Sequence, residues 1–170
     1  DGTLIKHVPY LSNVKDVHIL PTVIDALVQL SEHNIDLFVV TNQSGIGRGF
    51  FTIDEYFVVE SYINRLFMEH GISFKKTYFC PYHPEHGIGD YKKDSEDRKP
   101  KPGMLLSLMN EFNLSAHEVV MVGDNLVDIG AAHNADIESV FVTTGSTEYC
   151  DSFNAGYVAD SLLDATQNFV

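Results

Sequence analysis

The sequence has few cysteines, and they are far apart. Cys80 and Cys150 are separated by 69 residues, which excludes a dense disulfide framework, although the spacing leaves a single bridge open. This usage favours a reducing compartment, and we expect a cytoplasmic protein.

Basic residues are also scarce. Lysine and arginine number 11 against 24 acidic residues, for a net charge of −13. Nucleic acid is therefore not expected as a partner, because its binding needs a basic surface. A phosphate site in such a chain must gather its cations locally.

Long apolar runs are absent too. No uninterrupted stretch approaches the roughly 18 residues that a membrane span requires, so we expect no membrane partner. The length of 170 residues predicts one domain over residues 1–170, and we expect a monomer.

Helical and extended patterns alternate along the chain. Helices are predicted over 21–34, from the Thr52–Glu55 capping box to about 71, and over 102–112, 126–134 and 161–169. Strands are predicted over 35–41, 76–80, 119–122, 139–142 and 157–158, with a glycine-rich loop at 42–49 and a long polar loop at 81–101. This order predicts an α/β fold with a doubly wound, Rossmann-like parallel sheet, in which ligands bind beyond the carboxyl ends of the strands.

Three segments place polar or charged side chains at the ends of predicted strands or the starts of predicted helices, where a ligand would bind. Thr41-Asn42-Gln43-Ser44 ends a strand, where a hydroxyl and backbone N–H groups can bind a phosphoryl group; a plain polar turn is the alternative. Arg98-Lys99-Pro100-Lys101 places three cations before a helix, which favours anion binding; a solvated basic loop is the alternative.

The third segment contains a carboxylate after an apolar strand. Asp124 follows Val122-Gly123, where a carboxylate is costly unless it is paired or bound to a metal such as Mg²⁺. The alternative is that Asp124 caps the next helix.

Together with Asp1-Gly2-Thr3, these segments resemble the haloacid dehalogenase superfamily of phosphatases that use an aspartate nucleophile. Finer motifs are similar to the heptose 1,7-bisphosphate 7-phosphatase family and the related histidinol-phosphate phosphatases. The motifs are Thr41–Gly49, Cys80-Pro81-Tyr82-His83-Pro84, Arg98–Met104 and Gly123-Asp124. The resemblance implies a Mg²⁺-dependent phosphoric monoester hydrolase acting on a small phosphorylated sugar through an aspartyl-phosphate, without a large cap domain.

The resemblance also implies roles for individual residues. Asp1 would be the general acid/base and offer its carbonyl to Mg²⁺, Asp124 would bind Mg²⁺, and Thr41 and Lys99 would stabilise the phosphoryl group. Substrate contacts are implied for a further set: His7, Val8, Pro9, Tyr10, Asn42, Gln43, Ser44, Arg98 and Asn125.

The family's zinc site is one departure. The matching positions are Cys80, Tyr82, Ser95 and Asp97, so one of the usual ligands is present and zinc is not expected. A set of Cys80, His83 and His86 is the alternative.

The nucleophile is the other departure. The resemblance implies an aspartate two residues before Asp1, on a first central strand, and without it the residues from Asp1 onward are not expected to catalyse. A sugar-phosphate-binding protein without activity is the rival hypothesis from another class. A polynucleotide end phosphatase is a third, which the acidic balance disfavours.

Overall fold

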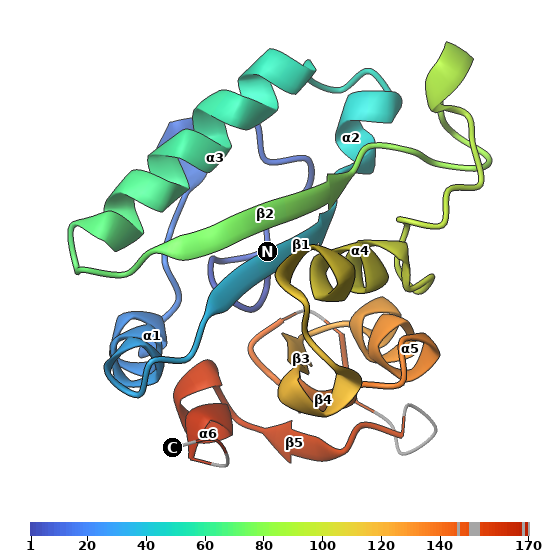
Figure 1. Cartoon of the computed structure of the whole chain (residues 1–170). Helices are drawn as coiled ribbons and strands as arrows, with labels where there is room; N and C mark the ends of the chain where they lie inside the picture. Colours follow the sequence, from blue (N-terminus) through green and yellow to red (C-terminus); the bar gives the residue numbers. More distant parts are fainter. Residues whose placement is uncertain (146, 150–153, 168, 170) are drawn as a thin grey trace.

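The computed structural model of the protein describes residues 1–145, 147–149, 154–167 and 169. The predicted α/β class is confirmed: the described residues form five parallel strands in two hydrogen-bonded groups (Figure 1). β1 (Leu37–Asn42) pairs with β2 (Phe74–Cys80), and β4 (Glu138–Val142) lies between β3 (Val120–Gly123) and β5 (Tyr157–Ala159). Each predicted strand is present, most of them one or two residues longer than predicted.

The helices follow the predicted alternation. They are α1 (Val23–Glu32), α3 (Ile53–Met68), α4 (Gly103–Phe112), α5 (Leu126–Asn134) and α6 (Leu162–Thr166), with short 3-10 turns at 14–16, 89–91 and 116–118. The Thr52–Glu55 capping box is confirmed: Thr52 Oγ1 accepts from Glu55 N at 3.2 Å, and Glu55 Oε2 accepts from Thr52 N at 2.7 Å. Because this box satisfies exposed N–H groups of the first turn, it fixes where α3 begins.

The prediction of an irregular loop over residues 42–49 is wrong in part. Residues 42–49 contain a single helical turn, α2 (Ser44–Gly47), where the glycines had indicated an irregular loop. Tertiary packing explains the difference, since a Cβ on Gly45 would lie 2.2 Å from the Phe51 ring. The glycine thus permits a close approach that stabilises a turn its own propensity disfavours.

Two apolar cores lie on opposite faces of the strand layer. One joins α1, Leu37, Phe67 and Leu162, and the other joins α4, α5 and Met121. Neighbouring residues of β1 divide between them, because Leu37 packs in the first core and Phe38 packs against the second. Phe38 and Met121 share that second core, so β1 and β3 belong to one layer although no backbone pairing joins them.

No large cap is evident in the described chain. Between Thr3 and β1 lie an extended segment and α1, and between β1 and Lys99 lie α2, α3, β2 and a long loop. This agrees with the capless architecture predicted. Within the described residues, no helix is both long enough and apolar enough to cross a bilayer.

Candidate active site

Lys99 connects the two groups of strands. Its Nζ donates to the Val40 carbonyl oxygen of β1 at 2.7 Å and lies 2.7 Å from Asp128 Oδ1 on α5. The side chains of Lys99 and Asp128 are each only 8% exposed, so this ion pair is shielded from water. A fixed cation therefore lies at the carboxyl ends of β1 and β3.

The main chain of Lys99 is held by Asn42, the last residue of β1. Asn42 Nδ2 donates to the Lys99 carbonyl oxygen at 3.0 Å, and Asn42 Oδ1 accepts from the Lys99 N–H at 3.1 Å. Both polar atoms of the amide are engaged in this way. Asn42, predicted from resemblance to contact substrate, is placed to position Lys99.

Asp124 is buried at the end of β3. Its side chain accepts a hydrogen bond from Thr3 Oγ1 at 2.8 Å, and the residue is 7% exposed. Burial raises the pKa of the Asp124 carboxyl, the Thr3 hydroxyl opposes that shift, and the nearby Asp128 carboxylate adds to it. No lysine or arginine ion pair neutralises Asp124 in the part of the chain described, since Lys99 is paired with Asp128.

The alternative role of Asp124 as a helix cap is wrong. Asn125 is the N-cap of α5: its Oδ1 accepts from Val127 N at 3.2 Å, while Asp128 Oδ2 accepts from Asn125 N at 3.0 Å. Because the neighbouring residue performs the capping, the Asp124 carboxylate is left for another partner.

Two glycines let the backbone pack closely against the Asp124 carboxylate. A Cβ on Gly2 would lie 2.0 Å from Asp124 Oδ2, and one on Gly145 would lie 2.1 Å from the same atom. The Gly2 backbone has φ +79° and its carbonyl accepts from Thr144 Oγ1 at 2.7 Å. Mg²⁺ is held in proteins by one or two carboxylates together with phosphate oxygens and water, so a buried carboxylate that makes no lysine or arginine ion pair among the described residues fits it.

The other predicted residues group into two sets. Asp1 is exposed and directly precedes Gly2 and Thr3, and Thr41 lies in β1, where its hydroxyl accepts from Gln43 Nε2 at 3.0 Å. Ser44 begins α2, and Asn125 Nδ2 donates to Thr147 Oγ1 at 2.8 Å. Thr41 lies near the carboxyl end of β1, and Ser44 and Asn125 come soon after β1 and β3. Asp1 adjoins Gly2 and Thr3, which contact Asp124.

A second set lies in the surrounding loops. His7 and Pro9 are exposed, and Val8 packs against the small core around Ile5 and Leu11. Tyr10 accepts from Arg48 Nη1 at 2.6 Å, and Arg98 Nη1 donates to the Tyr82 carbonyl oxygen at 3.3 Å. The structure does not bring this set into contact with Asp124 through any hydrogen bond among the described residues.

Sequence reasoning missed several residues of the site. Thr3, Asp128, Thr144 and Gly145 all contact the Asp124–Gly2–Lys99 group. The available signal was position: Asp128 lies four residues after Asp124, and Thr144-Gly145 come shortly after β4, which ends at Val142. Pairing partners so distant in sequence cannot be derived from position alone.

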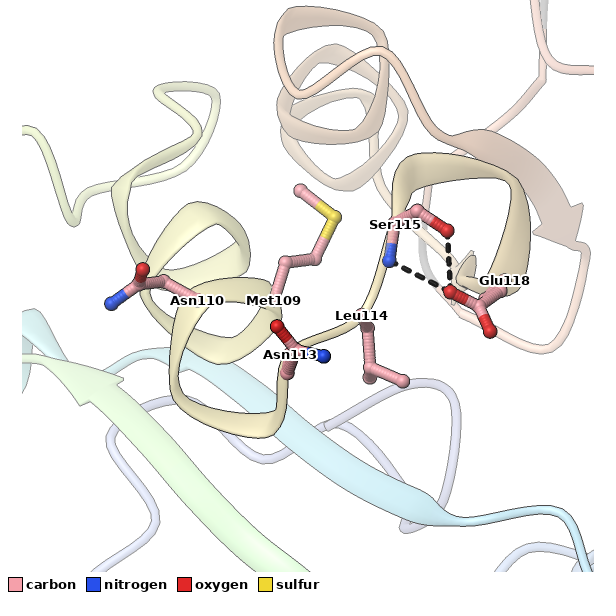
Figure 2. Close-up of a pocket in the computed structure, with 6 residues that line it drawn as sticks. All are labelled: Met109, Asn110, Asn113, Leu114, Ser115 and Glu118. Atoms are coloured by element: carbon pink, nitrogen blue, oxygen red, sulfur yellow. Dashed lines mark hydrogen bonds between the residues drawn. The ribbon is translucent and has the colours of Figure 1, made fainter.

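A surface hollow at the end of α4 lies away from these residues. Figure 2 shows residues that line it, Ser115 and Glu118 among them. Its volume is about 490 Å³. Its lining residues immediately precede β3, so it lies at the amino-terminal edge of the strands, opposite to Asp124. Ser115 and Glu118 form a capping box with each other, so these two polar residues already have partners within the fold.

The long loop after β2 closes around Cys80. Cys80 is fully buried and free, burial raises the pKa of its thiol, and the thiol lies in hydrogen-bonding contact with Tyr82 and Ser95. Ser95 is itself 3% exposed and accepts from Asp97 N at 3.2 Å. No group of three or more His, Cys, Asp or Glu side chains suited to a metal occurs among the described residues. Cys150 lies outside them.

A buried lysine and a buried carboxylate at the carboxyl edge of a parallel sheet are suited to binding phosphoryl groups in an α/β fold. A family model described as HAD-hydrolase-like matches residues 97–165. The D-glycero-beta-D-manno-heptose-1,7-bisphosphate 7-phosphatase of Haemophilus influenzae is 36% identical over 166 residues, covering 96% of this chain and 90% of that protein. The enzyme of the same name from Vibrio cholerae is 36% identical over 167 residues, covering 96% and 89%.

Solved structures agree on the fold. The D,D-heptose 1,7-bisphosphate phosphatase of B. bronchiseptica, complexed with magnesium and phosphate, superposes with a TM-score of 0.87 at 23% identity, covering 99% of this chain and 93% of that one. A HAD-like phosphatase structure from Mesorhizobium loti gives 0.85 at 30% identity, covering 99% and 83%. The chain belongs to the haloacid dehalogenase-like phosphatases, within the family of the heptose-1,7-bisphosphate 7-phosphatases. Members of this family are phosphoric monoester hydrolases.

Proposed function

We propose that this protein removes the 7-phosphate from a D-glycero-D-manno-heptose 1,7-bisphosphate in a Mg²⁺-dependent reaction. The observation that carries the proposal is that two aspartates on nearby positions, Asp124 and Asp128, differ in whether a lysine neutralises them. Asp128 neutralises Lys99, whereas Asp124 is buried and makes no ion pair with a lysine or arginine among the described residues. Such an arrangement suits a site where a metal ion and a phosphate dianion bind together.

Mg²⁺ would be held by the Asp124 carboxylate and by the carbonyl oxygen of Asp1. The bound cation would supply charge neutralisation for the phosphoryl oxygens. Thr3 orients Asp124 through its 2.8 Å hydrogen bond. Thr144 fixes the neighbouring turn by donating to the Gly2 carbonyl oxygen.

Lys99 and Thr41 would stabilise the transferring phosphoryl group. Lys99 is preorganised by Asp128, Val40 and Asn42, so its position costs no reorganisation during the reaction. Thr41 accepts from Gln43, which leaves its own hydroxyl hydrogen available for a phosphoryl oxygen. Asp1 would protonate the leaving sugar oxygen and then remove a proton from the attacking water.

The nucleophile is part of the proposal. We place it on an aspartate two residues before Asp1, which forms and then loses an aspartyl-phosphate. Among the described residues, β3 and β1 each have one unpaired edge. Gly2 and Thr3 lie against Asp124 at the end of β3, so a strand leading into them could pair with both edges and join the two groups in one sheet.

The choice of substrate rests on the relatives. Those covering most of the chain are named for the beta anomer, and a shorter match in Burkholderia mallei, 44% identical over 99 residues, is named for the alpha anomer. Histidinol phosphate is the second candidate within the superfamily. The capless architecture leaves the site covered by loops alone, which suits a seven-carbon sugar. A monomer in the cytoplasm, without nucleic acid or membrane partners, remains our expectation.

Phosphate release by the full-length protein tests the function. We expect release from one or both heptose 1,7-bisphosphate anomers, dependence on Mg²⁺, and turnover of histidinol phosphate at least tenfold slower. Binding of the bisphosphate without release would favour the inactive binding protein instead. Comparable rates on histidinol phosphate would overturn the choice of substrate.

A further inference from the structure

Two consecutive residues after β4, Thr144 and Gly145, contact both of the segments that would hold Mg²⁺. Thr144 Oγ1 donates to the Gly2 carbonyl oxygen at 2.7 Å, across 142 positions of the sequence. A Cβ on Gly145 would lie 2.1 Å from Asp124 Oδ2 and 2.5 Å from Asp124 Cβ. These two residues therefore touch the backbone next to Asp1 and the carboxylate after β3 at the same time.

Hydrogen bonds fix the backbone on both sides of Gly2. Its N–H donates to the Ile5 carbonyl oxygen at 2.7 Å, and its own carbonyl oxygen accepts from Thr144. The Asp1–Gly2 peptide bond is trans and planar, so the Asp1 carbonyl points opposite to the Gly2 N–H. Because glycine restricts its own backbone angles least of all residues, these two bonds set the direction of the Asp1 carbonyl.

Thr144 is a donor on a rigid support. Pairing with β5 continues one residue beyond the end of β4 at Val142, because the Thr143 N–H donates to the Ala159 carbonyl oxygen at 3.0 Å. Val142 and Ala159 are buried, so this support lies in the core. A threonine side chain has few χ1 rotamers, which keeps its hydroxyl in place. The sheet thus holds the Gly2 carbonyl through Thr144.

Gly145 confines Asp124 from another side. Thr3 Oγ1 donates to Asp124 Oδ1 at 2.8 Å, while the Gly145 backbone packs next to Asp124 Oδ2. The φ of Gly145 lies outside the left-handed region, so the backbone at this position would accept alanine. Its closeness to the Asp124 carboxylate is what favours glycine there.

The affinity of a protein for Mg²⁺ depends on how exactly its ligands are placed, because this ion requires nearly ideal octahedral geometry. Groups that orient the ligands of a metal ion typically contribute about 10- to 100-fold to its affinity. The Asp1 carbonyl and the Asp124 carboxylate come from distant parts of the chain. Their spacing therefore depends on contacts that join the two segments, as those of Thr144 and Gly145 do.

We propose that Thr144 and Gly145 are positioning residues of the Mg²⁺ site. Thr144 holds the backbone at Gly2, Gly145 holds the Asp124 carboxylate, and together they set the spacing between the two protein ligands. This inference rests on the proposed function, since it needs the Mg²⁺ site. It deepens that function by adding two residues that control the affinity for the metal through other residues.

Calorimetric titration of Mg²⁺ into the full-length protein, without substrate, tests the role of Thr144. Thr144→Val keeps the shape and removes the hydroxyl, so Mg²⁺ should bind about 10- to 100-fold more weakly. Thr144→Ser keeps the hydroxyl and should stay within about threefold of the wild type. The matched control is Thr143→Val, because Thr143 Oγ1 donates to the Asp160 carbonyl oxygen at 3.3 Å, away from the site. This control should change the affinity by less than about twofold.

Kinetics separate a role in metal positioning from a role in substrate binding. The activity of Thr144→Val should rise toward that of the wild type as Mg²⁺ is increased, with little change in the KM for heptose 1,7-bisphosphate, because Thr144 acts through the metal. Wild-type Mg²⁺ affinity in Thr144→Val, or an equal loss in Thr143→Val, would overturn the inference. A raised KM with unchanged Mg²⁺ affinity would do the same.

Gly145→Ala tests the second contact in the same titration. We expect Mg²⁺ to bind at least about tenfold more weakly, because the new methyl group displaces Asp124. The Tm without Mg²⁺ shows that the variant is folded, and a folded Gly145→Ala with wild-type affinity would overturn the role of Gly145. Failure of the proposed function would appear differently, as a wild type that binds Mg²⁺ more tightly than Thr144→Val but releases no phosphate from the bisphosphate.

Discussion

Lys99 and Asp128 form an ion pair of 2.7 Å in which each side chain is only 8% exposed. The pair joins the loop before α4 to the first turn of α5, and Lys99 extends it to β1 through the Val40 carbonyl. Because Lys99 is engaged by Asp128, Asp124, four residues earlier, has no lysine or arginine ion pair in the described part of the chain. The proposed chemistry depends on this difference between the two aspartates: Asp128 pairs with Lys99, and Asp124 is available to a metal ion.

Asp128→Asn should destabilise the protein. It leaves the Lys99 ammonium buried without its counter-charge, and breaking one side of a buried pair costs about 3 to 5 kcal/mol. Urea unfolding of the full-length protein measures this directly. The exposed pair of Lys76 with Glu111 provides the control, since Lys76→Gln should change stability far less. Equal effects of the two substitutions would contradict the structural role given to Asp128.

Asp124→Asn should remove the response to Mg²⁺. The wild type is expected to gain thermal stability as Mg²⁺ is added, because ligand binding to the native state raises Tm. The variant should show no Mg²⁺-dependent shift and should lose at least 100-fold in kcat. A variant that is stabilised by Mg²⁺ as strongly as the wild type would show that the metal binds elsewhere.

Gly2→Ala should impair the metal site beyond its effect on the backbone. The φ of +79° alone costs about 1 kcal/mol for a residue with a Cβ, and the new Cβ would also lie 2.0 Å from Asp124 Oδ2. Gly71→Ala is the matched control, because Gly71 has φ +76° and no atom within 4 Å of its would-be Cβ. We expect Mg²⁺ affinity to fall in Gly2→Ala and to be unchanged in Gly71→Ala. Equal Mg²⁺ affinities in the two variants would mean that Gly2 serves the turn alone.

Asp1→Asn should lower kcat by about 100- to 10,000-fold with little change in KM. The side chain would act on a proton in the transition state, so its removal affects chemistry more than binding. Steady-state kinetics on heptose 1,7-bisphosphate separate the two parameters. A rise in KM at constant kcat would instead assign Asp1 to substrate binding.

Purified protein should contain no stoichiometric zinc. Zinc binds cysteine as the thiolate, whereas burial raises the pKa of the Cys80 thiol and Tyr82 and Ser95 already contact it. Elemental analysis after purification without chelators checks the prediction. One zinc per chain would show that Cys80 recruits other ligands, and His83 and His86 would then be the first to mutate.

Local sequence signals predicted much of the fold. α5 begins at Leu126 and ends at Asn134 as predicted, and the Thr52–Glu55 capping box set the start of α3, because these signals act within one or two helical turns. α2 was missed since Gly45 has poor helix propensity and its turn depends on the Phe51 ring.

The site was less accessible to sequence reasoning. Position at strand ends singled out Thr41, Lys99 and Asp124, but the partner of each is set by three-dimensional packing. Asn42 hydrogen-bonds to Lys99, which is 57 positions away, and Lys99 forms its ion pair with Asp128 and not with Asp124. Neither pairing has a local signature.

The most direct test of the account is ³¹P NMR of D-glycero-D-manno-heptose 1,7-bisphosphate incubated with the full-length protein and Mg²⁺. We predict that the 7-phosphate resonance disappears while the anomeric phosphate resonance persists, as inorganic phosphate accumulates. The same spectra with Asp124→Asn should show almost no change over that time. Loss of the anomeric phosphate, or release by Asp124→Asn at the wild-type rate, would contradict the account.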